Sequence, residues 1–187
     1  MRIDAGSIDG SEWADIGGSM IRPATIADAK GISEIYNHYV LNATATFEEE
    51  SVTREEMEKR VAELTATHPW YVYESDGEVQ GFAYATRWKP RSAYRYSAET
   101  TVYVGHSSLG KGLGTALYTR LLDDLRERRM HAAIACIALP NEKSQALHEK
   151  MGYKKTAHFP EVGYKFGHWV DLGYWELLFD TESPRAF

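Results

Sequence analysis

Hydrophobic residues recur along the chain in alternating blocks, some spaced for helices and some for strands. A spacing of three or four residues places Ile32, Tyr36 and Tyr39 on one face of a helix, and Leu117 and Leu121 on one face of another. Other runs are rich in aromatic and β-branched residues, as strands are. The expected order is a strand at 20–25, helices after Thr25 and after Thr53, strands at 70–74, 78–88 and 97–104, a helix at 115–130, a strand at 132–139, a helix at 142–151 and strands near 156–166 and 169–179.

Short motifs support several of these boundaries. Thr25 with Asp28, and Thr53 with Glu56, have the three-residue spacing of a capping box, in which two side chains satisfy free N–H groups at a helix start. The segment Ser75-Asp76-Gly77 separates two strand-like runs. Because such a segment favours a tight turn, we expect a hairpin there.

The run AAIACIAL at 132–139 is apolar throughout, which is typical of a strand buried on both faces of a sheet. The order of expected strands and helices along the chain predicts a single α/β domain with a mixed sheet. Residues 1–19 lack periodicity, and we interpret them as a disordered N-terminal arm. The domain is expected over 20–180, with a C-terminal tail at 181–187.

The charge balance narrows the classes of partner. The chain has 187 residues, with 21 Lys and Arg against 27 Asp and Glu, giving a net charge of −6. This argues against nucleic-acid binding, which needs a positive field. No apolar run approaches the length of a membrane span, and the acidic N-terminus does not resemble a signal peptide. We therefore expect a cytoplasmic protein without a membrane or nucleic-acid partner.

Cysteine and histidine usage argues against a disulfide framework and against a metal site. Cys136 is the single cysteine, and its place in the apolar run suggests a core position. The seven histidines show neither H-E-x-x-H nor a close pair. No metal is expected.

The loop GHSSLGKGLG at 105–114 lies between an expected strand and an expected helix. Free backbone N–H groups at a helix N-terminus attract anions, and Gly110, Gly112 and Gly114 let a phosphate approach the backbone. Lys111 adds a positive charge. The loop alone leaves open a glycine-rich turn that binds nothing.

Two familiar phosphate sites do not fit this loop. Gly105 to Lys111 reads G-x-x-x-x-G-K, but Gly112 stands where a nucleotide-hydrolysing loop has the Ser or Thr that binds magnesium. A dinucleotide fingerprint needs glycine at Thr115, and an acid after the next strand, where 139–141 reads Leu-Pro-Asn. Both activities are rejected.

ETTVYV, LGKGLGTALY and IALPNEKSQALHEKMGY together resemble the Gcn5-related N-acetyltransferase superfamily. Further motifs are similar to phosphinothricin and methionine-sulfoximine acetyltransferases: IRPAT, NHYV, PW with YVYE, GFAYA, WKPRSAY, ALPN and GHWVDLGYW, in this order. The resemblance covers roughly residues 20–179. It implies an acetyltransferase fold with a mixed, mostly antiparallel central sheet flanked by helices, and a homodimer.

The resemblance also implies acetyl-CoA as the acetyl donor. In the family, a loop R/Q-x-x-G-x-G/A holds the pyrophosphate, and here it reads L-G-K-G-L-G with Leu109 in the place of Arg or Gln. The implied contacts to acetyl-CoA are the strand residues Val102, Tyr103 and Val104, the loop and helix residues Leu109, Gly110, Lys111, Gly112, Leu113, Gly114 and Thr115, and the polar residues Asn141 and Ser144. A helix cap at Asn141 and a solvent-facing Ser144 are an equally compatible interpretation of that pair.

Acetyl transfer to an amine needs a base for the amine proton and a proton for the departing thiolate. Glu99 opens the strand that leads into the glycine-rich loop, and the resemblance makes it the catalytic carboxylate. By the same resemblance His148 completes the catalytic pair, since imidazole exchanges protons near neutral pH. Without the resemblance, a solvent-facing glutamate and a helix-surface histidine would be preferred.

Residues 79–98 contain no acid, although the chain average of 27 acids in 187 residues predicts about three, and they hold four cations. Such a segment is typical of an anion receptor or of a basic surface strand or loop. By resemblance, Lys89, Arg91 and Tyr94 line the substrate pocket, which Phe47 covers, while Ala138 replaces a family glycine and Leu172 a family valine.

The expected function is transfer of an acetyl group from acetyl-CoA to the amino group of a small anionic amino acid analogue such as phosphinothricin. Methionine sulfoximine or sulfone is the alternative substrate. Two other classes stay open: an acetyltransferase for a protein N-terminus or a polyamine, and a non-catalytic CoA-binding sensor. Polyamines fit poorly, because Lys89 and Arg91 would repel them.

Overall fold

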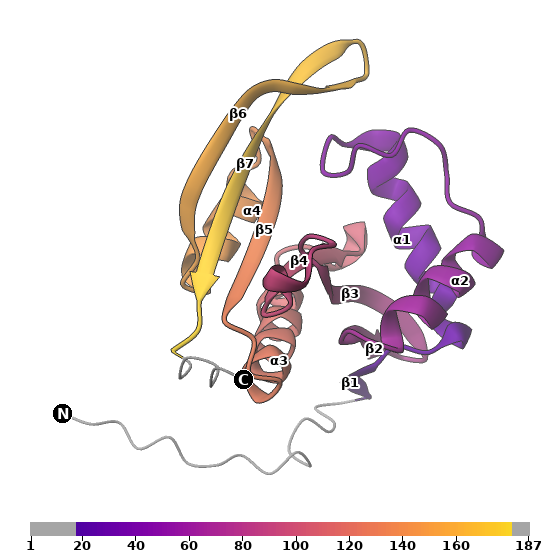
Figure 1. The fold of residues 1–187 in the computed structure, drawn as a ribbon. Helices are drawn as coiled ribbons and strands as arrows, with labels where there is room; N and C mark the ends of the chain where they lie inside the picture. The colour runs from indigo at the N-terminus through magenta and orange to yellow at the C-terminus, as the bar shows by residue number, and fades with distance from the viewer. Residues whose placement is uncertain (1–17, 181–187) are drawn as a thin grey trace.

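The computed structural model describes residues 18–180 and contains the expected succession of elements (Figure 1). Its strands and helices are β1 (Ser19–Pro23), α1 (Ala29–Asn42), α2 (Arg54–Thr65), β2 (Trp70–Ser75), β3 (Glu78–Arg87), β4 (Ser97–Val104), α3 (Leu113–Glu127), β5 (Ala132–Leu139), α4 (Glu142–Lys150), β6 (Lys154–Lys165) and β7 (His168–Leu178). Short 3₁₀ helices cover Ile26–Asp28, Ser92–Tyr94 and His106–Ser108. Of the arm expected over 1–19, residues 1–17 lie outside the described residues, as does the expected tail at 181–187. The end of the arm is corrected, because Ser19 already belongs to β1, where it pairs with Ser75 of β2.

All seven strands join one sheet in the order β1-β2-β3-β4-β5-β7-β6. Every neighbouring pair is antiparallel except β4 and β5. The expectation of an α/β fold with a mixed, mostly antiparallel sheet flanked by helices is therefore confirmed.

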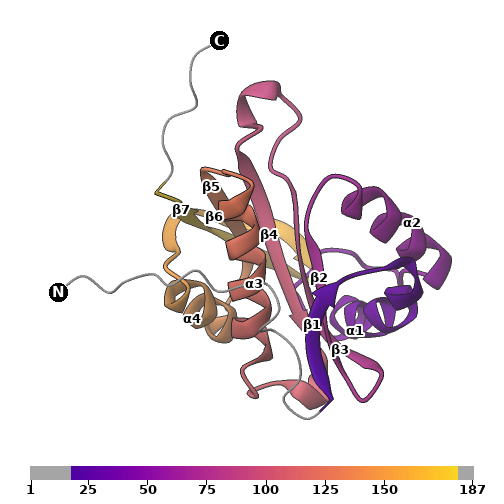
Figure 2. The same ribbon diagram turned by 90° about the horizontal axis from the view of Figure 1, so that it is seen from below.

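The two faces of the sheet are covered by different helices (Figure 2). α1 and α2 lie on one face, where Phe82 of β3 joins their core. α3 lies on the other face, where Ala83 and Ala85 of the same strand pack against its leucines. Successive side chains of a strand point to opposite faces, so β3 supplies both cores.

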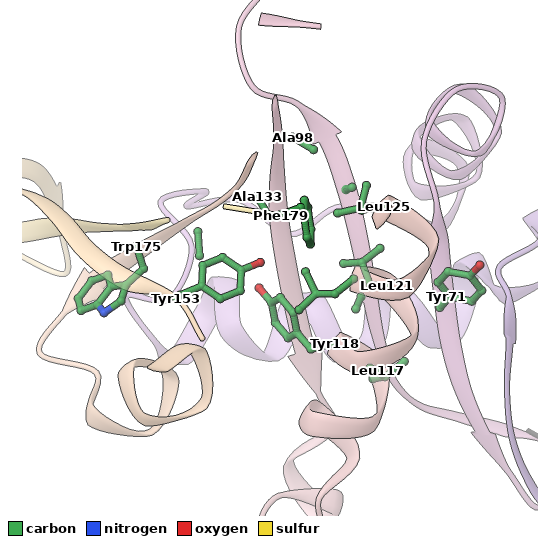
Figure 3. Packing of buried hydrophobic residues seen from close by; sticks show 14 of the residues in the cluster. Tyr71, Ala98, Leu117, Tyr118, Leu121, Leu125, Ala133, Tyr153, Trp175 and Phe179 are labelled. Atoms are coloured by element: carbon green, nitrogen blue, oxygen red, sulfur yellow. The ribbon is translucent and has the colours of Figure 1, made fainter. Parts of the chain in front are cut away.

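The apolar stripe expected on α3 is buried as predicted. Leu117, Leu121 and Leu125 are at most 1% exposed and lie in the core shown in Figure 3. Burying a leucine side chain contributes about 1.5–3 kcal/mol, so this stripe anchors the helix to the sheet. Small residues let it approach closely, since a Cβ added at Gly81 would lie 3.2 Å from Leu117 Cδ1.

α3 begins two residues earlier and ends three residues earlier than expected. Gly112, with φ of +84°, turns the chain into the helix at Leu113. At the other end Arg129 has φ of +56°, and Met130 N donates to Leu125 O at 3.0 Å. This is a Schellman ending, which usually takes glycine in the left-handed position, and with arginine there no residue type marks the helix end.

The parallel pairing of β4 with β5 stops early. It joins Ser97, Ala98 and Glu99 to residues 132–134 and goes no further. Beyond Glu99, β4 is paired on its β3 side alone, and the space between β4 and β5 is open to a ligand.

A partly buried ion cluster joins β1 to the start of α1. Arg22 donates two hydrogen bonds to the Asp28 carboxylate, at 2.7 and 2.8 Å, and a third to Glu74 of β2 at 2.8 Å. Burial alone would raise the pKa of the Asp28 carboxyl, but the hydrogen bonds from Arg22 and Thr25 outweigh it and hold that pKa below its ordinary value. Asp28 is 6% exposed, so removing Arg22 would leave a charge in a dry site.

We predict that Arg22→Met lowers the free energy of unfolding by about 2–4 kcal/mol at pH 7, because it leaves a buried carboxylate unpaired. A carboxyl whose pKa is lowered by folding stabilises above its ordinary pKa and loses that contribution as the pH falls through the folded value. The difference between wild type and variant should therefore shrink below about pH 4. Urea unfolding at several pH values measures it.

The control is Arg54→Met, which removes an exposed pair with Glu58 and should cost less than about 1 kcal/mol. If Arg22→Met costs no more than this, Arg22 does not stabilise the buried Asp28 carboxylate as proposed.

Candidate active site

A pocket of about 450 Å³ occupies the space between the diverging strands. Its walls come from α1, the loop after α1, β3, β4, α3, β5, α4 and β7. The lining residues are Tyr36, Tyr39, Thr44, Ala45, Thr46, Phe47, Tyr84, Glu99, Thr100, Thr101, Val102, Tyr103, Val104, Leu109, Tyr118, Cys136, Ile137, Ala138, Asn141, Lys143, Ser144, Leu147, His148 and Leu172.

The pocket gathers many of the residues singled out from the sequence. It contains Phe47, Glu99, Val102, Tyr103, Val104, Leu109, Ala138, Asn141, Ser144, His148 and Leu172. The structure does not bring the following into its wall: Lys89, Arg91, Tyr94, Gly110, Lys111, Gly112, Leu113, Gly114 and Thr115. The first three belong to the β3–β4 loop and the others to the glycine-rich loop and the first turn of α3.

Glu99 lies where the pairing between β4 and β5 ends. It pairs with Thr86 of β3 and with Ile134 of β5, and its half-buried side chain lines the pocket. Burial raises the pKa of the Glu99 carboxyl, while the Lys89 ammonium acts against this rise. A carboxylate with a raised pKa is a stronger base than a free one, which suits proton abstraction.

His148 is a buried side chain rather than a helix-surface one, with 4% exposure. Its Nδ1 lies 2.7 Å from the Ser144 carbonyl oxygen, and its Nε2 lies 2.7 Å from the Tyr118 hydroxyl. A carbonyl oxygen can accept but not donate, so Nδ1 carries the hydrogen and Nε2 accepts from Tyr118. Burial lowers the His148 pKa and favours the neutral ring, although the hydrogen bond to the Ser144 carbonyl acts against this lowering. The same hydrogen bond fixes which nitrogen of the neutral ring carries the hydrogen.

The edge of β4 beyond Glu99 faces the pocket without a strand partner on the β5 side. Tyr39 donates a hydrogen bond of 2.6 Å to the Val104 carbonyl at the end of this edge. A free strand edge can pair with the amide groups of an extended ligand. Val102 and Val104 therefore lie where such a ligand would run.

The glycine-rich loop has the backbone geometry expected for an anion site. Gly110 and Gly112 have φ of +77° and +84°, a region where side chains are strained, and a Cβ at either would meet nothing within 4 Å. The space beside the loop is open, and the first N–H groups of α3 lack helical partners. Gly114 has a different role, because its Cβ would lie 3.2 Å from Leu147 Cδ2 of α4.

Asn141 caps α4, as its position before the helix suggested. Its Oδ1 accepts a hydrogen bond from Ser144 N at 3.1 Å. Both side chains also line the pocket, so the cap and the ligand contact are compatible.

Sequence reasoning missed a group of hydroxyls deep in the pocket. The Tyr36 hydroxyl lies 2.8 Å from Thr46 Oγ1, and Tyr84 lies opposite Thr101 across the β3–β4 pairing. Burial raises the pKa of Tyr84 to about 12, so it stays protonated. Tyr36 occupies a helical core position in the sequence, and no spacing distinguishes a core tyrosine from one whose hydroxyl reaches a pocket.

The cations of the β3–β4 loop lie outside the pocket wall. Lys89 is exposed, with its Nζ 4.3 Å from the centroid of the Trp88 ring, and Tyr94 is 39% exposed. Arg91 precedes the short helix of this loop and is also exposed. Lys89 nevertheless acts on the pKa of Glu99, so its charge reaches the pocket.

Cys136 corrects the core assignment made from the apolar run. It is half-buried and lines the pocket. Burial raises the pKa of its thiol to about 11, so no thiolate forms near neutral pH. Cys136 is thus unsuited to act as a nucleophile.

Within residues 18–180, His, Cys, Asp and Glu side chains form no group of three that could hold a metal ion. In the same part of the chain, no helix is long and apolar enough to cross a membrane.

Comparisons with known proteins agree with this geometry. The family model described as "Acetyltransferase (GNAT) domain" matches residues 21–173. Phosphinothricin N-acetyltransferase of Streptomyces viridochromogenes is 41% identical over 88% of this chain and 90% of its own length. The L-methionine sulfoximine/L-methionine sulfone acetyltransferase of Salmonella typhimurium is 38% identical over 87% and 96%.

A solved acetyltransferase from Salmonella typhimurium, determined with acetyl-CoA, superimposes with a TM-score of 0.87 at 36% identity. The match covers 90% of this chain and 98% of that one. A family model over most of the chain and relatives of this similarity lead to one conclusion: the chain belongs to the GNAT family and is an N-acetyltransferase that takes its acetyl group from acetyl-CoA.

Proposed function

We propose that this acetyltransferase acetylates the α-amino group of a small anionic amino acid analogue, with phosphinothricin as the first candidate and methionine sulfoximine or sulfone as the second. The observation that carries the proposal is Glu99, a half-buried carboxylate with a raised pKa at the point where β4 and β5 part. Relatives named for these substrates support the choice.

Acetyl-CoA supplies the acetyl group as a thioester. Glu99 accepts the proton of the ammonium group, directly or through one water, which frees the nitrogen lone pair. Breaking the carbon–sulfur bond leaves a thiolate that needs one proton, and the amine has a second proton to lose once it has attacked. Nε2 of His148, which accepts from the Tyr118 hydroxyl, would assist by taking up this second proton and passing it to the departing sulfur. The transfer is direct in a ternary complex, and the protonated Cys136 gives no reason to invoke an acyl-enzyme.

The residues present fit acetyl-CoA. The open β4 edge suits its amide groups, and the glycine-rich loop suits its pyrophosphate. We assign the binding to the set given above from the sequence: Val102, Tyr103, Val104, Leu109, Gly110, Lys111, Gly112, Leu113, Gly114, Thr115, Asn141 and Ser144.

For the acceptor we propose the opposite end of the pocket. Phe47, Ala138 and Leu172 line it. Lys89, Arg91 and Tyr94 lie outside its wall and would attract the acidic groups of the acceptor at its rim, with Arg91 able to bind a carboxylate through two hydrogen bonds. This role follows from their charge and from the resemblance.

We also propose a homodimer in the cytoplasm, with herbicide resistance as one physiological outcome. The β6–β7 hairpin exposes a row of large apolar side chains: Phe159, Val162, Tyr164, Phe166 and Trp169. Exposed apolar patches of this kind mark interaction surfaces, and a second copy would cover them. Light scattering should give twice the chain mass of 21.2 kDa, and a monomer at micromolar concentration would contradict the dimer.

The proposed function predicts release of CoA thiol from acetyl-CoA when phosphinothricin, methionine sulfoximine or methionine sulfone is added, because only an acceptor amine completes the transfer. A thiol-reactive dye measures the rate, with acetyl-CoA alone as the control. Release with spermidine or an N-terminal peptide instead would favour another acetyltransferase. Binding of acetyl-CoA without release for any acceptor would favour the sensor.

A second prediction concerns Glu99. Glu99→Gln should lower kcat by about 100-fold or more, the usual size of a general-base contribution, while acetyl-CoA still binds. The base must be ionised, so kcat/KM should rise with pH through the Glu99 pKa. Lys89→Met removes the cation that lowers this pKa, and the rise should therefore shift to higher pH.

The exposed Lys154→Met on β6 is the matched charge control and should leave the profile unchanged. Wild-type turnover in Glu99→Gln would remove Glu99 from the mechanism. An unshifted profile in Lys89→Met would show that Lys89 does not act on the base.

A further inference from the structure

The loop that follows α1 forms one wall of the pocket. Thr44, Ala45, Thr46 and Phe47 all line it, although this loop has no helix or strand of its own. A wall of irregular backbone keeps its shape only if other elements hold it. The contacts of this loop therefore bear on what the pocket can bind.

Lys165, the last residue of β6, holds the loop from the hairpin side. Its Nζ donates hydrogen bonds to the carbonyl oxygens of Ala43, at 2.9 Å, and of Thr46, at 2.8 Å. The side chain is 1% exposed, and no carboxylate lies within ion-pair distance of it among residues 18–180. Burial lowers the pKa of the Lys165 ammonium, while Glu49 and Glu48 act against this from beyond ion-pair distance. Its Nζ also lies 4.9 Å from the centroid of the Phe166 ring. A buried ammonium is costly unless it is hydrogen-bonded, and the two carbonyl oxygens supply its direct hydrogen bonds.

A second contact joins the same two segments. A Cβ at Gly163 of β6 would lie 2.4 Å from Cζ of Phe47. The Phe47 ring thus rests directly on the backbone of β6, at a position where any other residue would displace it. In this position Phe47 is 39% exposed and lines the pocket.

The opposite side of the loop is held by the core. Tyr36 of α1 reaches Thr46 Oγ1 at 2.8 Å, and Tyr103 of β4 donates to the Ala45 carbonyl at 3.2 Å. The loop is thus fixed between the core and the hairpin, whose tip lies at the same end of the molecule as the loop in Figure 1. Lys165 and Gly163 supply the hairpin side of this arrangement.

We propose that Lys165 is a positioning residue for the acceptor: by binding two carbonyls of the loop after α1, it fixes Thr46 and Phe47 in the pocket wall. The inference rests on the proposed function, since it assumes that this end of the pocket binds the acceptor amine. Lys165 does not line the pocket, so it acts through the loop and not by contact with the substrate.

The test compares Lys165→Met with Lys165→Arg, and with Lys154→Met as the control for loss of an exposed lysine on the same strand. Steady-state kinetics are measured with the acceptor that gives the highest rate. Lys165→Met should raise the acceptor KM about tenfold or more, since small misplacements in a site are costly. The kcat and the acetyl-CoA KM should change less than about threefold, and Lys165→Arg should recover part of the acceptor KM.

If Lys165 had a merely structural role, Lys165→Met would lower the melting temperature but would not raise the acceptor KM more than the acetyl-CoA KM. A Lys165→Met variant with wild-type acceptor KM, or with both KM values raised equally, would overturn the proposal. If Lys165→Met does not fold, Gly163→Ala decides. It displaces Phe47 and leaves Lys165 intact, and an unchanged acceptor KM would overturn the idea that the hairpin positions this wall.

Failure of the proposed function gives a different result. In that case the wild type acetylates no amino acid analogue. The contact of Lys165 with the loop after α1 is then tested by measuring hydrogen exchange at residues 43–48. Exchange there should be faster in Lys165→Met than in Lys154→Met. Equal exchange in the two variants would show that Lys165 does not hold this loop in place.

Discussion

The pocket exists because the pairing of β4 with β5 ends after Glu99. A continued ladder would fill the space between the strands and would satisfy the backbone groups of Thr100 to Val104 internally. Instead, those groups form a free edge, and the carboxylate at the end of the ladder lies in the opening. The half-buried Glu99 carboxylate, the free edge of β4 and the cavity thus share one structural cause, which is that β4 and β5 pair at one end and separate at the other.

The polar groups of the pocket are kept dry and ordered by the core beneath it. Figure 3 shows the hydroxyl groups of Tyr118 and Tyr153 pointing towards one another among leucines and alanines. Thr100 Oγ1 lies 2.8 Å from the Tyr153 hydroxyl, and Tyr118 in turn bonds His148. In a low-dielectric core such hydrogen bonds fix side-chain orientation strongly. The histidine side chain therefore has one arrangement rather than several.

The sequence predicted the elements well where a local signal exists. The strand over 97–104, the strand over 132–139 and the cap of α2 by Thr53 all agree with the structure. The predicted end of α3 was wrong because an arginine takes the left-handed position that glycine usually occupies. The helix end is closed by a local hydrogen bond from Met130 N to Leu125 O, and no residue type at this point of the sequence marks it.

The site was less predictable than the fold, since it depends on contacts between distant segments. Glu99 and His148 could be named from motifs, but their burial could not. Lys165 contacts residues 119 and 122 positions away, and nothing in its neighbourhood of the sequence distinguishes it from an exposed hairpin lysine. Cys136 was placed in the core because its run is apolar, yet the parting of the strands turned its side chain to the pocket.

The small residues beneath α3 have a geometric consequence for the glycine-rich loop. A methyl group at Gly81 would lie 3.2 Å from Leu117 Cδ1 and 3.1 Å from the Tyr103 carbonyl oxygen of β4, so α3 would shift outward by a few tenths of an ångström wherever the Leu117 side chain cannot yield. The first turn of α3 would move with it, together with the loop that precedes it. The distance between the glycine-rich loop and β4 thus depends on the small volume of a residue on a neighbouring strand, outside the pocket wall.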